Sequence, residues 1–284
     1  MTEQLNNGIR FLDVRLHSDP AINANLTIVH GAFPVSLTST KHFRDLLLEL
    51  YTFLDRQPSE TIILSLKREG TGTATDEHLC RSLLTHYIDT ADASRWYTDP
   101  RIPILGATRG KIVLMRRFAL DDSLRTRHSG RGWAIDAECW ADNTAHDVHG
   151  QVCVQDFYEV LETVNIERKR AYVEAQLRRA AECTCHLPGI TTDPVNPVPP
   201  HPFYLNFLSA SNFWRVGCWP ERIARRLNPG VVEWLCVRHH QDEVGDGGTG
   251  ILVCDWVGQQ GDWDLVRCIV GMNSKLMCRE MSLS

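Results

Sequence analysis

The feature that most constrains the fold is a series of short apolar segments that alternate with stretches carrying a helical repeat of apolar residues. Gly, Asn, Ser, Asp or Pro bound the apolar segments, as is typical of strands buried between helices. We expect strands at residues 8–16, 26–33, 61–66, 111–115, 152–156, 203–209 and 251–255, and helices at residues 39–57, 76–90, 158–183, 220–240 and 263–276. This alternation predicts an α/β fold with a parallel sheet and helices outside it.

Polar side chains recur where the predicted strands end. They are Asp13, Arg15, His30, Lys67, Glu69, Arg117, Tyr204 and Asp255. In parallel α/β folds the chemistry gathers at the C-terminal ends of the strands. Asp13 and Arg15 are two residues apart, so they share one face of their strand. With His30 they supply a carboxylate, a guanidinium and an imidazole, which together predict half of a phosphoryl-transfer site.

Composition narrows the class of protein. The chain has 284 residues, 43% of them hydrophobic and 23% charged, with a net charge of −5. No basic block is present, so a nucleic-acid partner is not expected. No apolar run approaches the ~20 residues of a transmembrane helix. The polar N-terminus has no signal segment, and the compartment stays open between secreted and cytoplasmic with peripheral membrane contact.

The ten cysteines are scattered and form no Cys-x-x-Cys pair. Several lie inside apolar runs, where a free cysteine is an ordinary small core residue. We expect mostly free thiols, with one or more disulfides as the alternative. The sequence Cys183-Thr184-Cys185-His186 has poor spacing for zinc, and the polar segment 238–243 has a metal-like composition only. No metal site is expected at either place.

Four segments resemble a known family. They are Gly8–Arg15 (GIRFLDVR), Ile28–Gly31 (IVHG), Pro58–Glu69 (PSETIILSLKRE) and Arg109–Leu114 (RGKIVL). In order and spacing they resemble the catalytic X domain of phosphatidylinositol-specific phospholipase C, in its metal-independent bacterial branch with its fungal relatives. The resemblance covers roughly residues 5–118, with weaker similarity at residues 203–209 and 251–255.

The resemblance implies a fold and an activity. The fold is a distorted, incompletely closed TIM (β/α) barrel, which would make residues 1–284 a single domain with surface loops at 119–150 and 184–202. The activity is that of a phosphoric diester hydrolase or lyase. The inositol 2-hydroxyl of phosphatidylinositol attacks phosphorus, and diacylglycerol and a cyclic inositol phosphate are released. The implied partner is a phospholipid at a membrane surface, and a monomer is expected.

The resemblance also implies catalytic roles. His30 matches the general acid, and imidazole is the side chain that most often donates a proton in acid–base catalysis. Asp13 matches the carboxylate that orients this histidine, and Arg15 matches the phosphate-binding guanidinium. Because Arg15 stands where the calcium-dependent branch has an acidic metal ligand, neither a metal nor a cofactor is expected.

Further positions follow the same pattern. Lys67, Glu69, Arg117 and Tyr204 match positions that contact inositol, and Asp255 matches the carboxylate that pairs with the general-base histidine. In the family this histidine ends a first barrel strand, before the strand matched by Gly8–Leu16. The chain begins about seven residues before that strand, so a barrel incomplete at the N-terminus is expected, without this histidine. The alternative function is an inactive or truncated homologue that binds an inositol phosphate or anionic headgroup.

Each of these positions also has a purely structural interpretation. A histidine on a strand can be a satisfied core residue, an Asp–Arg pair a simple salt bridge, and a charged strand end a solvated turn. Those interpretations apply to His30, to the pair Asp13 and Arg15, and to Lys67, Glu69, Arg117, Tyr204 and Asp255. The aromatic side chains of Phe213, Trp214 and Trp219 could touch lipid, but the sequence alone favours packing.

Overall fold

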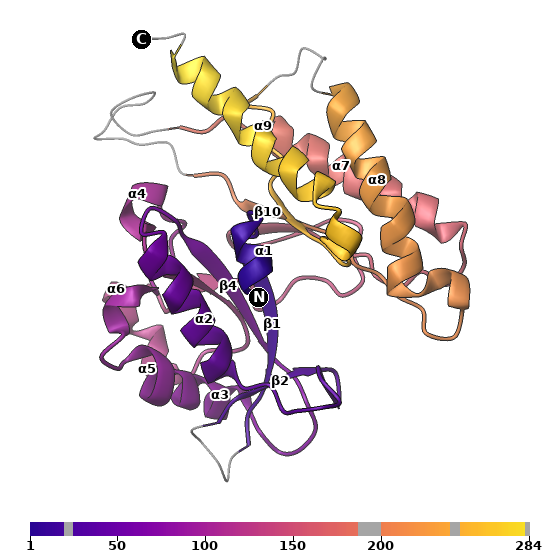
Figure 1. Ribbon diagram of the computed structural model, residues 1–284. Coiled ribbons are helices and arrows are strands. Elements are labelled where there is room, and N and C mark those ends of the chain that lie inside the picture. The colour runs from indigo at the N-terminus through magenta and orange to yellow at the C-terminus, as the bar shows by residue number, and fades with distance from the viewer. Residues whose placement is uncertain (20–24, 187–199, 239–244, 282–284) are drawn as a thin grey trace. The chain divides into compact units, whose positions relative to one another are not determined.

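The chain divides into two compact units, Met1–Cys139 and Trp140–Ser284 (Figure 1). The computed structural model describes residues 1–19, 25–186, 200–238 and 245–281. Each unit has its own sheet and its own helices. The expectation that residues 1–284 form one barrel domain stays a prediction.

The N-terminal unit is built on a seven-stranded sheet. Its strands are β1 (Phe11–His17), β2 (Thr27–His30), β3 (Phe33–Pro34), β4 (Ile62–Arg68), β5 (Trp96–Tyr97), β6 (Ile112–Arg117) and β7 (Ile135–Asp136). Its helices are α1 (Thr2–Asn6), α2 (Phe43–Arg56), α3 (Asp76–Leu83), α4 (Leu105–Thr108), α5 (Asp122–Arg125) and α6 (Arg127–Gly130). A π-helical turn, Leu84–Ile88, extends α3, so the helix expected at residues 76–90 is present in two parts.

The strands of this sheet follow the order β3-β2-β1-β4-β6-β5, and β7 also pairs with β6. The central strands β1, β4 and β6 are parallel, as the sequence predicts. The strand β2 is different, because it pairs antiparallel with β1 at Leu16 and His17 only. A short connection of this kind can return as a hairpin, whereas a parallel crossover needs a dozen or more residues. The prediction of a parallel sheet is therefore confirmed for β1, β4 and β6 and wrong for β2.

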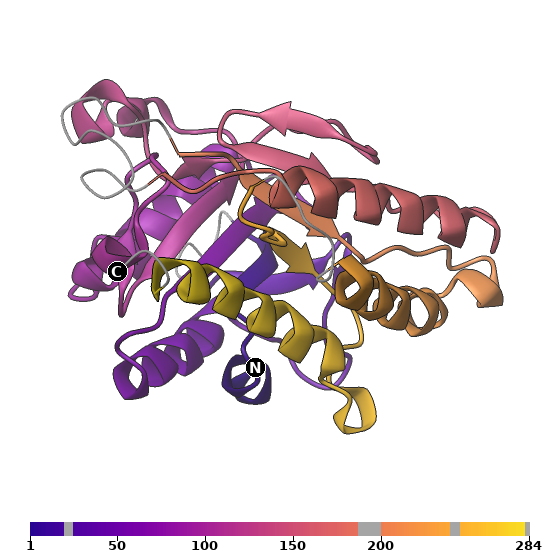
Figure 2. The ribbon, with the colours of Figure 1, turned by 90° about the horizontal axis from the view of Figure 1, so that it is seen from above.

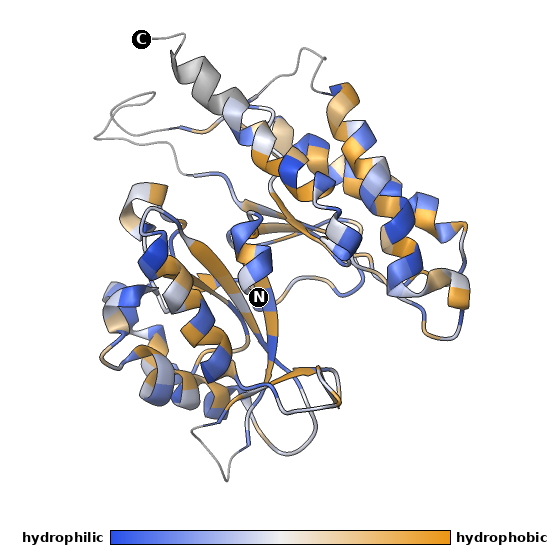
Figure 3. Cartoon of the chain, viewed as in Figure 1, coloured by the Kyte–Doolittle hydropathy of each residue, from blue (hydrophilic) through white to orange (hydrophobic). Residues whose placement is uncertain are grey.

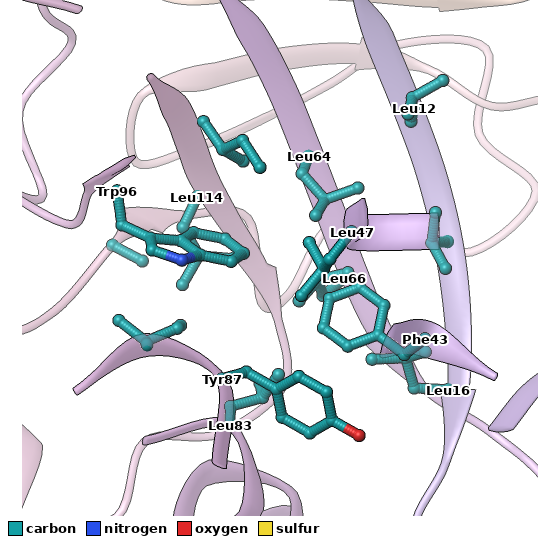
Figure 4. Close-up of a cluster of buried hydrophobic side chains, with 14 of the residues drawn as sticks. Leu12, Leu16, Phe43, Leu47, Leu64, Leu66, Leu83, Tyr87, Trp96 and Leu114 are labelled. Carbon is teal, nitrogen blue, oxygen red and sulfur yellow. The ribbon is translucent and has the colours of Figure 1, made fainter. Parts of the chain in front are cut away.

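Strand alternation separates two faces in this unit. In β1 the buried residues Leu12, Val14 and Leu16 alternate with half-buried Asp13 and Arg15. The apolar face packs against the buried stripe of α2 and against α3, Tyr87 and Trp96 (Figure 4), and Figure 3 shows the apolar concentration on β1 and β4. Full burial of each such side chain contributes about 1.5–3 kcal/mol. This core fixes the strands, and so the polar residues of the opposite face are held in place.

The C-terminal unit has a four-stranded sheet with the order β11-β10-β9-β8. Its strands are β8 (Asp147–His149), β9 (Val152–Gln155), β10 (Phe203–Phe207) and β11 (Ile251–Val253), and its helices are α7 (Asn165–Ala181), α8 (Pro220–Arg238) and α9 (Asp264–Met281). The strands β9, β10 and β11 are parallel, and β8 is antiparallel to β9. The helix α7 packs on β9 and β10, α8 packs on α7, and α9 packs on α8 (Figure 2).

One expected helix contains a proline, and one expected loop is corrected. The helix α8 continues through Pro229, although proline removes one backbone donor and typically breaks or kinks a helix. Buried Leu227 and Val231 lie on either side of it, and their packing holds the helix together. The segment expected to be a surface loop at residues 119–150 contains α5, α6, β7 and β8. Most of the loop expected at 184–202 lies outside the described residues.

Within the described ranges, no helix is long and apolar enough to cross a membrane. The nine cysteines whose side chains are described there are free thiols. In the same ranges, no group of three or more His, Cys, Asp or Glu side chains is arranged to hold a metal ion.

Candidate active site

A buried carboxylate lies at the centre of the polar face of β1. Asp13 accepts a hydrogen bond from the Ser65 hydroxyl at 2.8 Å, and Arg117 Nη1 lies 3.1 Å from each of its carboxylate oxygens. Arg15 Nη2 lies 3.6 Å away. The side chains of Asp13 and Arg117 are only 10% and 7% exposed. The parallel register explains this cluster, since Asp13 pairs with Ser65 of β4 and Lys67 of β4 pairs with Arg117 of β6.

A second carboxylate, Glu69, follows the end of β4 and joins three segments. It forms an ion pair with Arg15, lies 3.2 Å from the ammonium of Lys67 and accepts a hydrogen bond from the Gly31 backbone N–H at 2.8 Å. Burial alone would raise the pKa of Glu69, but Gly31, Arg15 and Lys67 outweigh it and lower the pKa below its ordinary value of 4.5. Glu69 is therefore held as a carboxylate at neutral pH.

The Gly31 contact also positions His30, which ends β2 with an exposed side chain. Gly31 has φ +59°, a conformation that glycine adopts at little cost, and the bond to Glu69 ties this turn to Arg15 and Lys67. In the described structure the hydrogen bonds and ion pairs of Asp13 go to Ser65, Arg15 and Arg117, and none goes to His30. The role of Asp13 in orienting His30 therefore stays a prediction.

The three cations of this face lie in one row across adjacent strands. Arg15 of β1 pairs in register with Lys67 of β4, which pairs with Arg117 of β6. Together with Asp13 and Glu69 they leave one excess positive charge. Guanidinium groups suit the planar, two-oxygen recognition of phosphate. The row can therefore accept a singly charged phosphodiester.

The two remaining predicted site residues belong to the C-terminal unit. Asp255 follows β11, and its backbone carbonyl accepts a hydrogen bond from the Asn228 side chain at 3.1 Å. Tyr204 lies near the N-terminal end of β10, where its hydroxyl accepts a hydrogen bond from the Cys183 thiol at 3.2 Å. Burial raises the pKa of Tyr204. Tyr204 thus lies at the opposite end of its sheet from Asp255, and the structure does not bring the two together.

The sequence interpretation did not identify a fully buried lysine in the same unit. Lys169 of α7 donates hydrogen bonds to Gln155 Oε1 at 3.1 Å and to the Phe157 carbonyl at 2.5 Å. Burial lowers its pKa to about 7, although the carboxylates of Asp156 and Asp255 oppose this. These contacts place a titratable cation beneath the turn that follows β9.

The sequence interpretation also did not identify Ser65, the residue that donates a hydrogen bond to Asp13. Ser65 and Lys169 each leave a signal in the sequence. Ser65 precedes Lys67 by two residues in a strand, so alternation places both on one face. Lys169 interrupts an apolar stripe of α7 whose other buried members include Ile166, Val173 and Leu177. A lysine at a position with apolar spacing is unusual unless it has partners.

Comparison with known proteins gives these residues a context. Residues 1–118 match the family model described as phosphatidylinositol-specific phospholipase C, X domain, which confirms the resemblance over that part of the chain. A 1-phosphatidylinositol phosphodiesterase of Listeria monocytogenes is 34% identical over 119 residues, which are 40% of this chain and 33% of that protein. The match thus spans about a third of the length of this relative.

Solved structures of phosphatidylinositol-specific phospholipase C share the fold. One from Staphylococcus aureus has a TM-score of 0.68 and 22% identity, and it covers 95% of this chain and 82% of its own. The enzyme from Listeria monocytogenes has a TM-score of 0.64 and 21% identity, covering 96% of this chain and 81% of its own. This likeness confirms the α/β class and the distorted (β/α)-barrel type of fold.

Proposed function

We propose that this chain, whose first 118 residues match the phospholipase C X domain, is a phosphoric diester hydrolase or lyase that cleaves the glycerol–phosphate bond of phosphatidylinositol-like lipids. The observation that carries the proposal is the row of Arg15, Lys67 and Arg117, held in register by β1, β4 and β6. The Listeria relative is named a 1-phosphatidylinositol phosphodiesterase, which supports the same substrate class.

In the proposed reaction the inositol 2-hydroxyl oxygen forms a bond to phosphorus, and the bond from phosphorus to the glycerol oxygen breaks. His30 donates its proton to the leaving alkoxide, so diacylglycerol departs as a neutral alcohol. Arg15 stabilises the charge that grows on the phosphoryl oxygens. Glu69 keeps Arg15 and the Gly31 turn in place, while Asp13 does the same for Arg117. Lys67 and Arg117 are proposed to contact the inositol phosphate.

The resemblance assigns the hydroxyl proton to a histidine that pairs with the position of Asp255, and that role is carried over to no histidine of this sequence. In the proposed reaction this proton therefore passes to solvent water. General acid–base groups each contribute about 10²–10⁴-fold, so we expect slow turnover. The assay therefore follows phosphatidylinositol vesicles over hours by ³¹P NMR, with cyclic inositol phosphate as the expected product.

Two variants assign the general acid. His30→Ala should lower the rate by about 10²–10⁴-fold. His86→Ala is the matched control, because His86 is a histidine of the same unit in the turn Leu84–Ile88, away from the polar strand face. It should leave the rate unchanged. Equal rates for the wild-type chain and His30→Ala would refute the role of His30.

The alternative function is an outcome of the same experiment. If the chain binds phosphatidylinositol vesicles in preference to phosphatidylcholine vesicles but releases no product, it is a headgroup-binding module that uses its cation row. Arg15→Ala should then abolish the preference. Absence of both turnover and preferential binding would refute both functions.

The proposed action at a membrane surface has support in the C-terminal unit. Trp214 is 96% exposed and Phe213 is 68% exposed, so the packing expected for these two side chains is not what the structure has. Leu161 is also exposed, and its carbonyl accepts a hydrogen bond from the Asn212 side chain at 3.3 Å. Aromatic rings are well suited to the lipid–water interface. Trp214→Ala should weaken vesicle binding, whereas Val270→Ala, at a half-exposed position of α9, should not.

A further inference from the structure

The C-terminal unit contains a cation that is completely removed from water. Lys169 has 0% exposure and projects from α7 beneath the end of β9. Its ammonium donates to Gln155 Oε1 and to the Phe157 carbonyl. These two acceptors flank Asp156 in the sequence, so Lys169 holds the turn on both sides of this carboxylate.

A buried amide network extends this anchor across the sheet. Gln155 Oε1 also accepts a hydrogen bond from the Phe157 backbone N–H at 2.8 Å. Gln155 Nε2 donates to Asn206 Oδ1 and to the Phe207 carbonyl, each at 2.9 Å. The ends of β9 and β10 are therefore tied to the same lysine. Asp156, which is 9% exposed, accepts a hydrogen bond from Trp140 Nε1 at 3.1 Å.

The charges that face Lys169 come from two turns. Asp156 follows β9 and Asp255 follows β11, and both favour the charged form of the amine. The neutral amide of Asn206 on β10 is joined to this network through Gln155, and the neutral amide of Asn228 on α8 donates to the backbone carbonyl of Asp255. Burial opposes the charge and brings the pKa of Lys169 to about 7. A neutral amine keeps two N–H donors for the two acceptors, but its hydrogen bonds are no longer charge-assisted.

We propose that Lys169 is a positioning residue that holds Asp156 at the C-terminal end of β9, and that loss of its proton loosens this turn and leaves Asp156 and Asp255 without the charge that offsets them. Charge-assisted hydrogen bonds are roughly twice as strong as neutral ones, so the protonated lysine holds the turn more firmly.

The first experiment needs no activity. The indole N–H of Trp140 reports on Asp156, and its signal in a ¹⁵N-tryptophan NMR spectrum is assigned with Trp140→Phe. In the wild-type chain this signal should shift with a midpoint near pH 7. Lys169→Met should abolish the transition, whereas Arg168→Met should retain it because Arg168 lies on the exposed side of the same helix turn. A wild-type signal that does not change between pH 6 and pH 9 would overturn the proposal.

A second variant keeps the proposal testable if Lys169→Met does not fold. Lys169→Gln, which can still hydrogen-bond but carries no charge, then replaces it in the NMR titration and should likewise abolish the transition. A transition near pH 7 that persists in Lys169→Gln would overturn the role of Lys169.

Discussion

Replacement of Lys169 by methionine should change the stability of the protein in a way that depends strongly on pH. The side chain is fully buried, and its pKa is lowered from an ordinary value of 10.5 to about 7. The folded state therefore binds this proton less tightly than the unfolded state does. Between about pH 7 and pH 10.5 the unfolded chain carries the extra proton, so the free energy of unfolding rises with pH.

The magnitude follows from these two pKa values. One pH unit corresponds to about 1.4 kcal/mol, so the buried ammonium costs about 5 kcal/mol at pH 6 and about 2 kcal/mol at pH 9. Methionine has no charge and removes this cost. It also removes the donor to the Phe157 carbonyl, which costs about 1–3 kcal/mol. Lys169→Met should thus stabilise the protein by about 2–4 kcal/mol at pH 6 and have a small net effect at pH 9.

The assay is urea unfolding of both proteins at pH 6, 7, 8 and 9, followed by circular dichroism. The stability difference between Lys169→Met and the wild-type chain should shrink by about 3 kcal/mol across this range. The difference between the charged and the neutral hydrogen bond is already contained in the pKa shift, so the remaining contribution of the lost bond is the same at every pH and cancels from this comparison. Arg168→Met is the control and should show no such trend. A stability difference that is constant from pH 6 to pH 9 would refute the account of Lys169 as a titrating buried amine.

Three other predictions concern the polar face of β1. Asp13→Ala removes the buried carboxylate that contacts Arg117 and should lower the free energy of unfolding by about 3–5 kcal/mol. The control is Asp122→Ala, at a fully exposed side chain, and equal effects of the two substitutions would contradict the buried pairing. Glu69→Gln should lower the free energy of unfolding by about 1–3 kcal/mol at pH 7. Because the pKa of Glu69 is lowered in the folded state, its carboxylate stabilises the fold above pH 4.5, and this stabilisation is lost as the carboxylate becomes protonated at lower pH. Urea unfolding at pH 3 should therefore show a smaller stability difference between Glu69→Gln and the wild-type chain than at pH 7. An undiminished stability difference at pH 3 would argue against the carboxylate contacts. Gly31→Ala should cost about 1–2 kcal/mol in thermal unfolding because of its positive φ, and a stabilised variant would rule out the assigned turn.

The sequence determined much of the N-terminal unit by itself. Strand alternation places Asp13 and Arg15 on one face of β1, and the apolar repeat of residues 39–57 predicts α2 with its buried stripe. Both depend on local periodicity, since side chains alternate every two residues in a strand and return every 3.6 residues in a helix. The four segments with family resemblance added the fold type, which the structural likeness confirms.

Tertiary structure alone decided which partners these side chains have. Asp13 contacts Ser65 and Arg117, residues 52 and 104 positions away. The parallel register places Ser65 level with Asp13, and it places Arg117 level with Arg15, two residues further along the same face. The antiparallel return of β2 and the placement of Lys169 under Asp156 are also contacts between separate elements. Local periodicity specifies a face but carries no information about which distant residue meets it. The carboxylate at the centre of the site was therefore evident in the sequence, while the groups that hold it became evident only when the strands were paired.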